Sequence, residues 1–436
     1  MIQGELSETM HQRHSEHLKR KIAANASRLL DAVRQSPVRP KGLDHFIDVL
    51  DNVYVSDDVR SHLGGKEETP AVIGLYCMMV PEELIYAAGF IPLRLCGGSY
   101  DAFLVGGDYA PRDACPVVKA SLGSSLRGVP SVYGLCDVVI VPTTCDAKRK
   151  AAEELSRFSE VWVLEMPHVK DSEASREGWR CQLYGLAKEL NNLGKRKGSK
   201  TKINRSNLKK AMELIGAASY QARRLFSLRK LSPPALSGME ASIALSAYGF
   251  DRADIWTREM KSLNDELENR QGERVSRCLQ RRPRLLLAGS PSIFPNWKVP
   301  LIADEMGADI VVDESCVGDR LLYDVAGLSE KTLDSMIEAL AARYLAPCVC
   351  PVFTPNDDRL YRLIELAGEF AIDGVIYHVL KGCIPYDFEL YRVERIFRER
   401  KVPVLRIETD YTLEDVEPLR TRIEAFIEML AGKEKK

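Results

Sequence analysis

Short apolar segments alternate with helical patterns in two separate parts of the chain, and this alternation constrains the fold most strongly. Residues 136–142 (CDVVIVP) form a continuous apolar run, as expected for a parallel strand that is buried on both faces. Strands separated by helices imply a parallel sheet. The strands that we expect are Ala71–Tyr76, Ile91–Leu95, Cys136–Pro142, Val161–Leu164, Leu285–Ala288, Ile310–Asp313, Gly374–Val379 and Val404–Ile407.

The two α/β parts resemble each other in their order of elements. In each part a strand is followed by a helix that begins near a proline and ends at a glycine, Gly89 or Gly307, and then by another strand. We therefore predict an α/β protein with two similar Rossmann/flavodoxin-like parallel-sheet domains and with helical N-terminal and connecting segments. The predicted divisions are an N-terminal helical segment (1–66), a first α/β domain (67–200), a helical connector (201–280) and a second α/β domain (281–436).

Helical patterns fill the remaining segments. Apolar residues recur at helical spacing between Ser7 and Val33, and residues 206–275 look helical throughout. Residues 194–205 (GKRKGSKTKINR) contain basic residues and no acid, so we expect a loop or linker there. The further helices that we expect are Pro81–Gly89, Lys148–Phe158, Ser329–Tyr344, Asp358–Ala367 and Glu389–Arg398.

The composition excludes several classes of protein. The chain has 436 residues, with 61 Lys and Arg against 62 Asp and Glu, and a net charge of −1. A nucleic-acid-binding protein would normally carry an excess of basic residues. No apolar run reaches the ~18 residues that a membrane span requires, and the polar N-terminus shows no secretory signal. We therefore expect a cytoplasmic protein that binds neither nucleic acid nor membrane.

The chain contains 11 cysteines, an odd number for a disulfide framework. Disulfides rarely persist in a reducing compartment, which leaves buried thiols, a catalytic thiol, or ligands to a metal or iron–sulfur cluster. Six cysteines occupy loops in two series, spaced 30 to 38 residues apart. They are Cys77, Cys115 and Cys145 in the first half, and Cys316, Cys350 and Cys383 in the second.

The placement of these cysteines favours an iron–sulfur cluster. Several follow a strand, at the sheet edge where open α/β sheets bind ligands, and thiolates are soft ligands for such clusters. Helix N-termini also stabilise the negative charge of a thiolate-bound cluster. Structural zinc usually requires paired close ligands, whereas this chain has one CxC, at Cys348 and Cys350. A Cys/His nucleophile requires one activated thiol, and no single cysteine stands out.

At these residues the chain resembles the family of cluster-bearing subunits of 2-hydroxyacyl-CoA dehydratases and benzoyl-CoA reductases. The resemblance lies in PEELIYAAG after Cys77, CPVVKASLG at Cys115, CDVVIVPTTCD, and the stretch from Gly374 that ends in VPVLRIETD. It implies that Cys115, Cys145 and Cys383 hold a single [4Fe–4S] cluster. The three additional loop cysteines, with DESCVGDR and CVCPVFTPNDDR, resemble the double-cubane branch of the family, in which two bridged cubanes take three cysteines each.

The sequence leaves the ligand sets open. The family resemblance suggests Cys115, Cys145 and Cys383 for one cubane and Cys77, Cys316 and Cys350 for the other, whereas the internal repeat suggests one trio in each half. Cys348 is an alternative to Cys350, which we prefer because its spacing matches the first series. We set aside Cys96, Cys136, Cys181 and Cys278 as ordinary cysteines.

The resemblance implies three possible functions. The first is a homodimeric reductase with an [8Fe–9S] double cubane, which receives low-potential electrons from an ATP-hydrolysing iron–sulfur partner of the activator type and reduces acetylene-, azide- or hydrazine-like molecules. The second is a 2-hydroxyacyl-CoA dehydratase subunit with one [4Fe–4S] cluster. The third is a non-catalytic iron–sulfur carrier. The sequence has no G-x-x-x-x-G-K-[ST] phosphate loop, in agreement with a separate ATPase.

Three residues near the cysteines are weaker candidates. His378 lies five residues before Cys383 on an expected buried strand, where it could face the cluster and donate protons as a catalytic residue, although a buried structural histidine is the commoner case. Glu314 and Arg320 flank Cys316. They could adjust the local charge or hold the loop, or they could form a surface ion pair.

Overall fold

The structure is a computed structural model of the 436-residue chain. It describes residues 2–36, 38–63, 70–270, 281–327, 329 and 331–433. The ends of the predicted N-terminal segment and helical connector, at residues 64–66 and 271–280, and the cysteine at position 278 lie outside these ranges. The division of the chain into four parts therefore stays a prediction.

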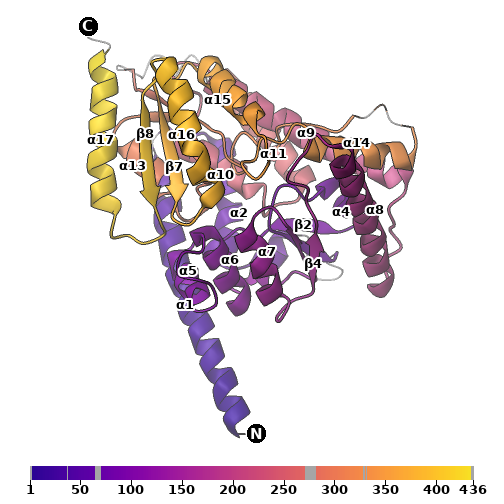
Figure 1. Ribbon diagram of the computed structural model, residues 1–436. Helices are drawn as coiled ribbons and strands as arrows, with labels where there is room; N and C mark the ends of the chain where they lie inside the picture. Colours follow the sequence, from indigo (N-terminus) through magenta and orange to yellow (C-terminus); the bar gives the residue numbers. More distant parts are fainter. Residues whose placement is uncertain are drawn as a thin grey trace.

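The described chain forms two four-stranded, all-parallel sheets with helices on both faces, as the alternation of strands and helices predicts (Figure 1). The first sheet has the order β2-β1-β3-β4 and the second the order β6-β5-β7-β8. All eight expected strands are present within two residues of their expected ends. They are β1 (Val72–Leu75), β2 (Ile91–Arg94), β3 (Val138–Pro142), β4 (Val161–Leu164), β5 (Arg284–Gly289), β6 (Asp309–Asp313), β7 (Gly374–Leu380) and β8 (Val404–Thr409).

Two helical layers enclose each sheet because alternate side chains of its buried strands point to opposite faces. Ile73 and Ile140 of the first sheet pack with α4, α8 and α9, while Val139 packs in the core that contains α6 and α7. The helices of the first half are α1 (Ile2–Arg34), α2 (Asp44–Tyr54), α3 (Val59–Leu63), α4 (Glu82–Ala87), α5 (Tyr100–Gly107), α6 (Pro116–Arg127), α7 (Asp146–Leu155) and α8 (Glu173–Arg196).

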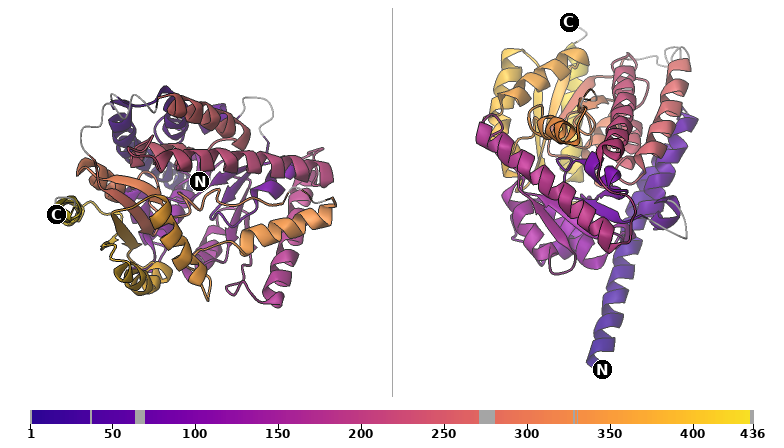
Figure 2. Two further views of the ribbon diagram at one scale, coloured as in Figure 1. Left: turned by 90° about the horizontal axis from the view of Figure 1, so that it is seen from above. Right: turned by 90° about the vertical axis from the view of Figure 1, so that its right-hand side faces the viewer.

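The remaining helices connect the sheets and cover the second one. Leu285 and Ile376 pack with α13 and α17, whereas Val375 packs in the core that contains α16 (Figure 2). These helices are α9 (Arg205–Arg229), α10 (Gly238–Ala247), α11 (Ala253–Asn269), α13 (Lys298–Glu305), α14 (Leu333–Leu345), α15 (Asp357–Glu369), α16 (Ile384–Glu399) and α17 (Val416–Lys433). No helix within the described ranges is both long and apolar enough to cross a bilayer.

The expected loop at residues 194–205 is shorter than predicted. Helix α8 continues to Arg196, and α9 begins at Arg205. The Arg196 guanidinium pairs with Glu160 at 2.7 Å, and Lys197 pairs with Asp137. These basic residues therefore find acidic partners at the first sheet of their own chain.

The carboxyl ends of the two sheets meet. A Cβ atom on Gly98, which follows β2, would lie 2.1 Å from the carbonyl oxygen of Ile293, which follows β5. The Tyr411 hydroxyl, just after β8, donates a hydrogen bond of 3.0 Å to the carbonyl of Gly97. Loops that follow strands of both sheets are thus brought together between the two halves (Figure 1).

One segment from the second half of the sequence packs against the first half. Met336 and Leu340 of α14 are buried in the same core as Trp179 and Leu183 of α8. Beyond α14, the Lys170 ammonium donates hydrogen bonds of 3.1 Å to the carbonyls of Ala346 and Cys348. This crossing carries the Cys348–Cys350 segment to the first sheet, where Cys77 lies.

Candidate metal centre

Three of the predicted ligand cysteines occupy the same position relative to a helix. Cys115, Cys145 and Cys383 are the N-cap residues of α6, α7 and α16, and none of the three side chains accepts a capping hydrogen bond from its own helix. The first N–H groups of a helix and its dipole favour negative charge at this position. Each thiol is therefore placed where a thiolate is stabilised.

These three cysteines form one group, which we call the first thiol set. A hydrogen bond between the Cys115 and Cys383 side chains raises the pKa of Cys115 and lowers the pKa of Cys383. The charge of Cys145 raises the pKa of Cys115 further. The set joins the two halves, because Cys115 and Cys145 belong to the first and Cys383 to the second.

A glycine turn makes this approach possible. Gly382 has φ +76°, and a Cβ atom there would lie 2.0 Å from the Asp113 carbonyl oxygen. Only glycine adopts this conformation without strain and lets two backbones come so close. The turn between β7 and α16 is therefore pressed against the Cys115 loop.

The second thiol set consists of Cys77, Cys316 and Cys350. Burial raises the pKa of the Cys316 thiol to about 12, and the charge of Cys77 adds to this effect. Burial likewise raises the pKa of Cys350. The charge of Arg320 lowers this pKa, and the charge of Cys77 raises it. The three thiols are thus close enough to interact electrostatically, and they again come from both halves of the sequence.

Electrostatic interactions join Cys115 with Cys383 and Cys145, and Cys77 with Cys316 and Cys350, and the partition of ligands between cubanes stays a prediction. Two further cysteines lie near the second set. Burial and the charges of Cys350 and Cys77 raise the pKa of Cys348, and the charge of Cys96 acts on Cys316. Cys348 contacts Met79 through sulfur at 3.3 Å, and Cys136 donates to the Val132 carbonyl at 3.3 Å. Cys181 is exposed. The assignment of individual cysteines as ligands, including Cys350 over Cys348, stays a prediction.

A cavity of about 70 Å³ lies beside the second thiol set. Cys77 and Cys316 line it together with Lys148, Arg94 and Cys96, and apolar residues complete its wall. We set Cys96 aside from the sequence as an ordinary cysteine, but the structure places it in this cavity. Lys148 was also missed. Its position in the first turn of a helix, three residues after Cys145, was the signal that could have revealed it.

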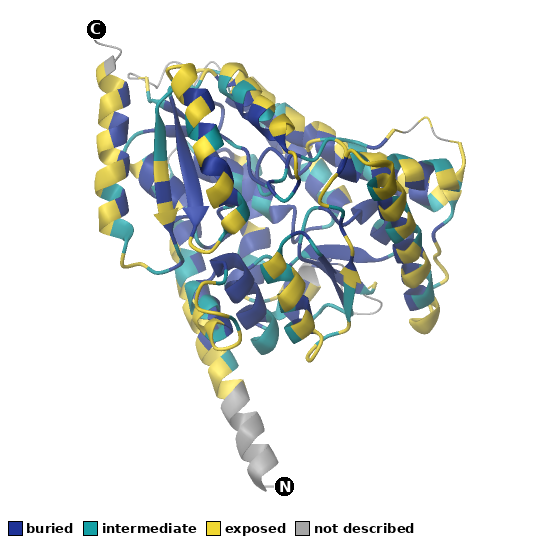
Figure 3. Cartoon of the chain, in the orientation of Figure 1, coloured by how far each residue is buried: buried dark blue, intermediate teal, exposed yellow. Residues whose placement is uncertain are grey.

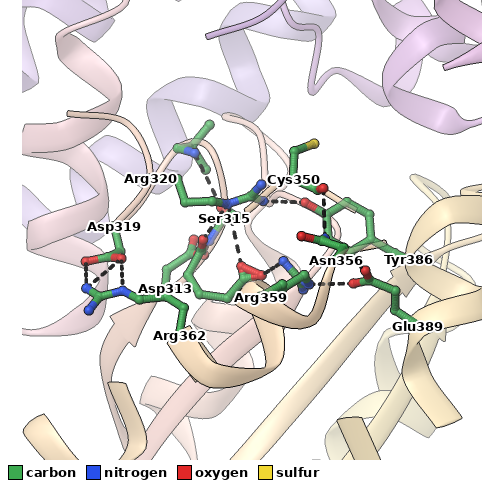
Figure 4. Close-up of polar contacts among 12 residues, drawn as sticks. Asp313, Ser315, Asp319, Arg320, Cys350, Asn356, Arg359, Arg362, Tyr386 and Glu389 are labelled. Atoms are coloured by element: carbon green, nitrogen blue, oxygen red, sulfur yellow. Dashed lines mark hydrogen bonds and ion pairs between the residues drawn. The ribbon is translucent and has the colours of Figure 1, made fainter. Parts of the chain in front are cut away.

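The loops that carry the second set are held by a buried ion network (Figure 4). Glu314 and Arg320 are each 3% exposed, so the ion pair between them, at 3.7 Å, is buried and does not lie at the surface. The Arg320 Nε donates to the Glu314 carbonyl at 2.8 Å, and its Nη2 donates to the Tyr386 hydroxyl. The Cys316 loop is thereby fastened to α16, the helix that begins at Cys383.

Arg359 lies at the centre of this network and was not recognised in the sequence. Its guanidinium pairs with Glu314 and, at 2.6 Å, with Glu389, and it lies over the Tyr386 ring at 5.0 Å. Asn356 donates to the Cys350 carbonyl at 2.9 Å and to Glu389 at 3.1 Å. The network therefore fixes the Cys316, Cys350 and Cys383 loops relative to one another.

His378 is buried and reaches the thiols only through another residue. Its Nδ1 makes a 3.0 Å hydrogen bond with the Ser290 carbonyl, and the Ser290 side chain in turn hydrogen-bonds to Cys383. Burial lowers the pKa of His378 to about 4. The charges that act on it most are those of Lys298 and Asp415, not of a cysteine. Its catalytic role stays a prediction.

The donor chemistry fits a multi-iron cluster better than a single ion. Within the described ranges, no three His, Cys, Asp or Glu side chains converge closely enough to hold one metal ion. The first thiol set at helix N-termini and the second set in loops, with Lys148 acting on both, match the soft ligands and negative charge of an iron–sulfur cluster. A cluster spreads its charge over several iron atoms and needs no single convergence point.

Comparisons with known proteins identify the family of this chain. A family model described as 2-hydroxyglutaryl-CoA dehydratase, D-component, matches residues 77–430, a span that includes all six predicted ligands. The putative dehydratase subunit YjiM of Escherichia coli (strain K12) is 32% identical over 84% of this chain and 93% of its own length. The (R)-phenyllactyl-CoA dehydratase beta subunit of Clostridium sporogenes is 23% identical over 89% and 99%.

A reductase is among the more distant relatives. One of the subunits of the benzoyl-CoA reductase of Thauera aromatica is 21% identical over 84% of this chain and 92% of its own length. The extent of the family match and the identity to YjiM establish the family. This chain therefore belongs to the 2-hydroxyglutaryl-CoA dehydratase D-component family.

Proposed function

We propose that this chain is an iron–sulfur subunit of a 2-hydroxyacyl-CoA dehydratase, which removes water from a 2-hydroxyacyl-CoA. The observation that carries the proposal is the first thiol set, in which Cys115, Cys145 and Cys383 cap three helices and approach one another. The relatives named as dehydratase subunits favour this reaction over the reduction of small molecules.

Cys115, Cys145 and Cys383 would hold the cluster, and the N-termini of α6, α7 and α16 would stabilise its negative charge. The cluster would supply single electrons at low potential. The buried network around Arg359 would keep the Cys316, Cys350 and Cys383 loops fixed while charge changes beside them. We propose an ATP-hydrolysing iron–sulfur protein as the electron donor and a second subunit as partner.

A second candidate follows from the second thiol set. Cys77, Cys316 and Cys350 also gather at the junction of the two halves, and the simple dehydratase cluster does not require them. They favour a double-cubane cluster in a homodimeric reductase that reduces acetylene-, azide- or hydrazine-like molecules. The two candidates differ in the number of iron atoms that the chain holds.

Iron and sulfide analysis of the protein, purified without oxygen, separates these functions. The proposal expects about four iron atoms per chain, and the double-cubane candidate about eight. C145A should lose cluster iron, whereas C181A, which changes an exposed cysteine, should retain it. C316A should leave the iron content unchanged in the single-cluster case and lower it in the double-cubane case.

Turnover with a low-potential donor then distinguishes an enzyme from a carrier. Dehydration of a 2-hydroxyacyl-CoA supports the proposed function, and reduction of acetylene supports the second candidate. Iron-loaded protein that catalyses neither reaction with an activator present would instead identify a non-catalytic carrier. Protein that takes up no iron or sulfide would contradict all three.

A further inference from the structure

Lys148 is a cation in a position that normally disfavours one. It lies in the first turn of α7, three residues after the N-cap Cys145, and its side chain lines the cavity beside Cys77, Cys96 and Cys316. The helix dipole places positive charge at this end and favours anions there. Long side chains of a helix also lean toward its N-terminus, which carries the ammonium toward Cys145. Lys148 therefore needs a nearby anion.

Carboxylates do not provide that anion. The acidic residue in the first turn of α7 is Asp146, which is exposed and pairs with Arg149 at 3.0 Å. Lys150, on the same helix, pairs with Glu153. Within the described part of the chain, no carboxylate forms an ion pair with Lys148. The other cation in the cavity wall, Arg94, has its own partner, because Glu82 binds it at 2.6 Å.

The charges that reach Lys148 come from cysteines of both thiol sets. Burial lowers the pKa of Lys148, but Cys77, Cys96, Cys145 and Cys316 raise it more, so that the net shift is upward. Conversely, the charge of Lys148 lowers the pKa of Cys350 and of Cys383. Lys148 thus acts on cysteines of both sets.

We propose that Lys148 balances the negative charge of the iron–sulfur cluster that the chain binds, and thereby raises the reduction potential of that cluster. This inference rests on the proposed function only in requiring that the chain binds an iron–sulfur cluster. Each electron taken from a low-potential donor adds one negative charge beside the ammonium. A cation within a partly buried site favours that added charge, because the local dielectric constant is low. Lys148 acts through the cluster and need not contact a substrate.

The test compares three variants of the anaerobic, iron-loaded protein. K148M removes the charge and keeps the length of the side chain, K148R keeps the charge, and K150M removes an exposed charge from the same helix. The readouts are iron and sulfide per chain and the midpoint potential, measured by electron paramagnetic resonance during titration with dithionite. We expect K148M to have a more negative midpoint potential, and K148R and K150M to resemble the wild type.

The possible outcomes distinguish an error in the role inferred for Lys148 from an error in the proposed function of the chain. Full iron content with an unchanged potential in K148M would overturn the role of Lys148 and leave the proposed function intact. If K148M loses iron but keeps its circular dichroism spectrum, recovery of iron in K148R supports a role for the charge, whereas loss in both variants overturns it. Wild-type protein that takes up no iron or sulfide would overturn the proposed function together with this inference.

Discussion

At the scale of single residues, burial turns ordinary charged side chains into structural elements of the site. Arg359 is 1% exposed and pairs with two acids, Glu314 in the loop after β6 and Glu389 on α16. A buried ion pair of this kind contributes little net stability to the fold in comparison with apolar packing. Removing one partner, however, leaves the charge of the other partners buried and uncompensated. Its main effect is therefore to specify how the cysteine loops are arranged.

Arg359→Met should destabilise the protein strongly. The substitution leaves Glu389 buried without its cation and leaves Glu314 only the more distant Arg320, at 3.7 Å. Such a change typically costs about 3–5 kcal/mol. The matched control is Arg392→Met, since Arg392 is 38% exposed and pairs with Asp357 at the surface, where a loss of less than about 1 kcal/mol is expected. Urea unfolding of both variants measures the difference. Equal stability of the two variants would contradict the role assigned to Arg359.

His378 should make the stability of the protein depend on pH. Burial lowers its pKa to about 4, so the folded state binds this proton less readily than the unfolded state, whose histidine has a pKa of about 6.5. Stability from this residue is present at neutral pH and is lost as the pH falls toward 4. Relative to His378→Gln, the wild type should lose about 2 kcal/mol between about pH 7.5 and about pH 5.

The measurement is the free energy of unfolding of both proteins across that pH range. The comparison uses only the change with pH in the difference between the two unfolding free energies. The effect of the substitution on packing is the same at every pH and therefore cancels. A constant difference between the two proteins would show that His378 does not titrate as its burial predicts.

At the scale of elements, the site depends on where helices begin. The sequence predicted that α16 starts near Glu389, but the helix begins at Ile384, directly after Cys383. The turn from β7 is therefore very short and needs Gly382 in the left-handed region. Pro385 fits the first turn of this helix because the first N–H groups have no partner within it.

Gly382→Ala should separate the Cys115 and Cys383 loops. The left-handed conformation alone costs about 1–3 kcal/mol for a residue with a side chain, and the new Cβ would collide with the Asp113 carbonyl. We expect lower stability and loss of cluster iron. Gly107→Ala is the control, because a Cβ there meets nothing within 4 Å. Thermal unfolding and iron content check both variants. Full iron content in G382A would contradict the importance of this turn.

At the scale of the whole molecule, the site lies where two similar sheets turn their carboxyl ends toward each other. Each thiol set takes residues from both halves, so neither half alone holds a complete set. Figure 3 shows that most strands and the facing sides of the helices are buried, while the edge strands β4 and β8 are partly exposed and exposed residues cover the outer faces of the helices. The packing of α14 against α8 closes the arrangement, because it carries Cys350 across to Cys77.

The sequence by itself determined the strands, their parallel arrangement and the loops in which the cysteines lie, because these follow from local hydrophobic patterns. It also indicated the family through residues in and around those loops. Only the tertiary structure decided which cysteines face one another, since that depends on how the two sheets dock and on the crossing of α14. The tertiary structure likewise revealed Lys148 and Arg359, whose roles depend on burial and on partners far away in the sequence.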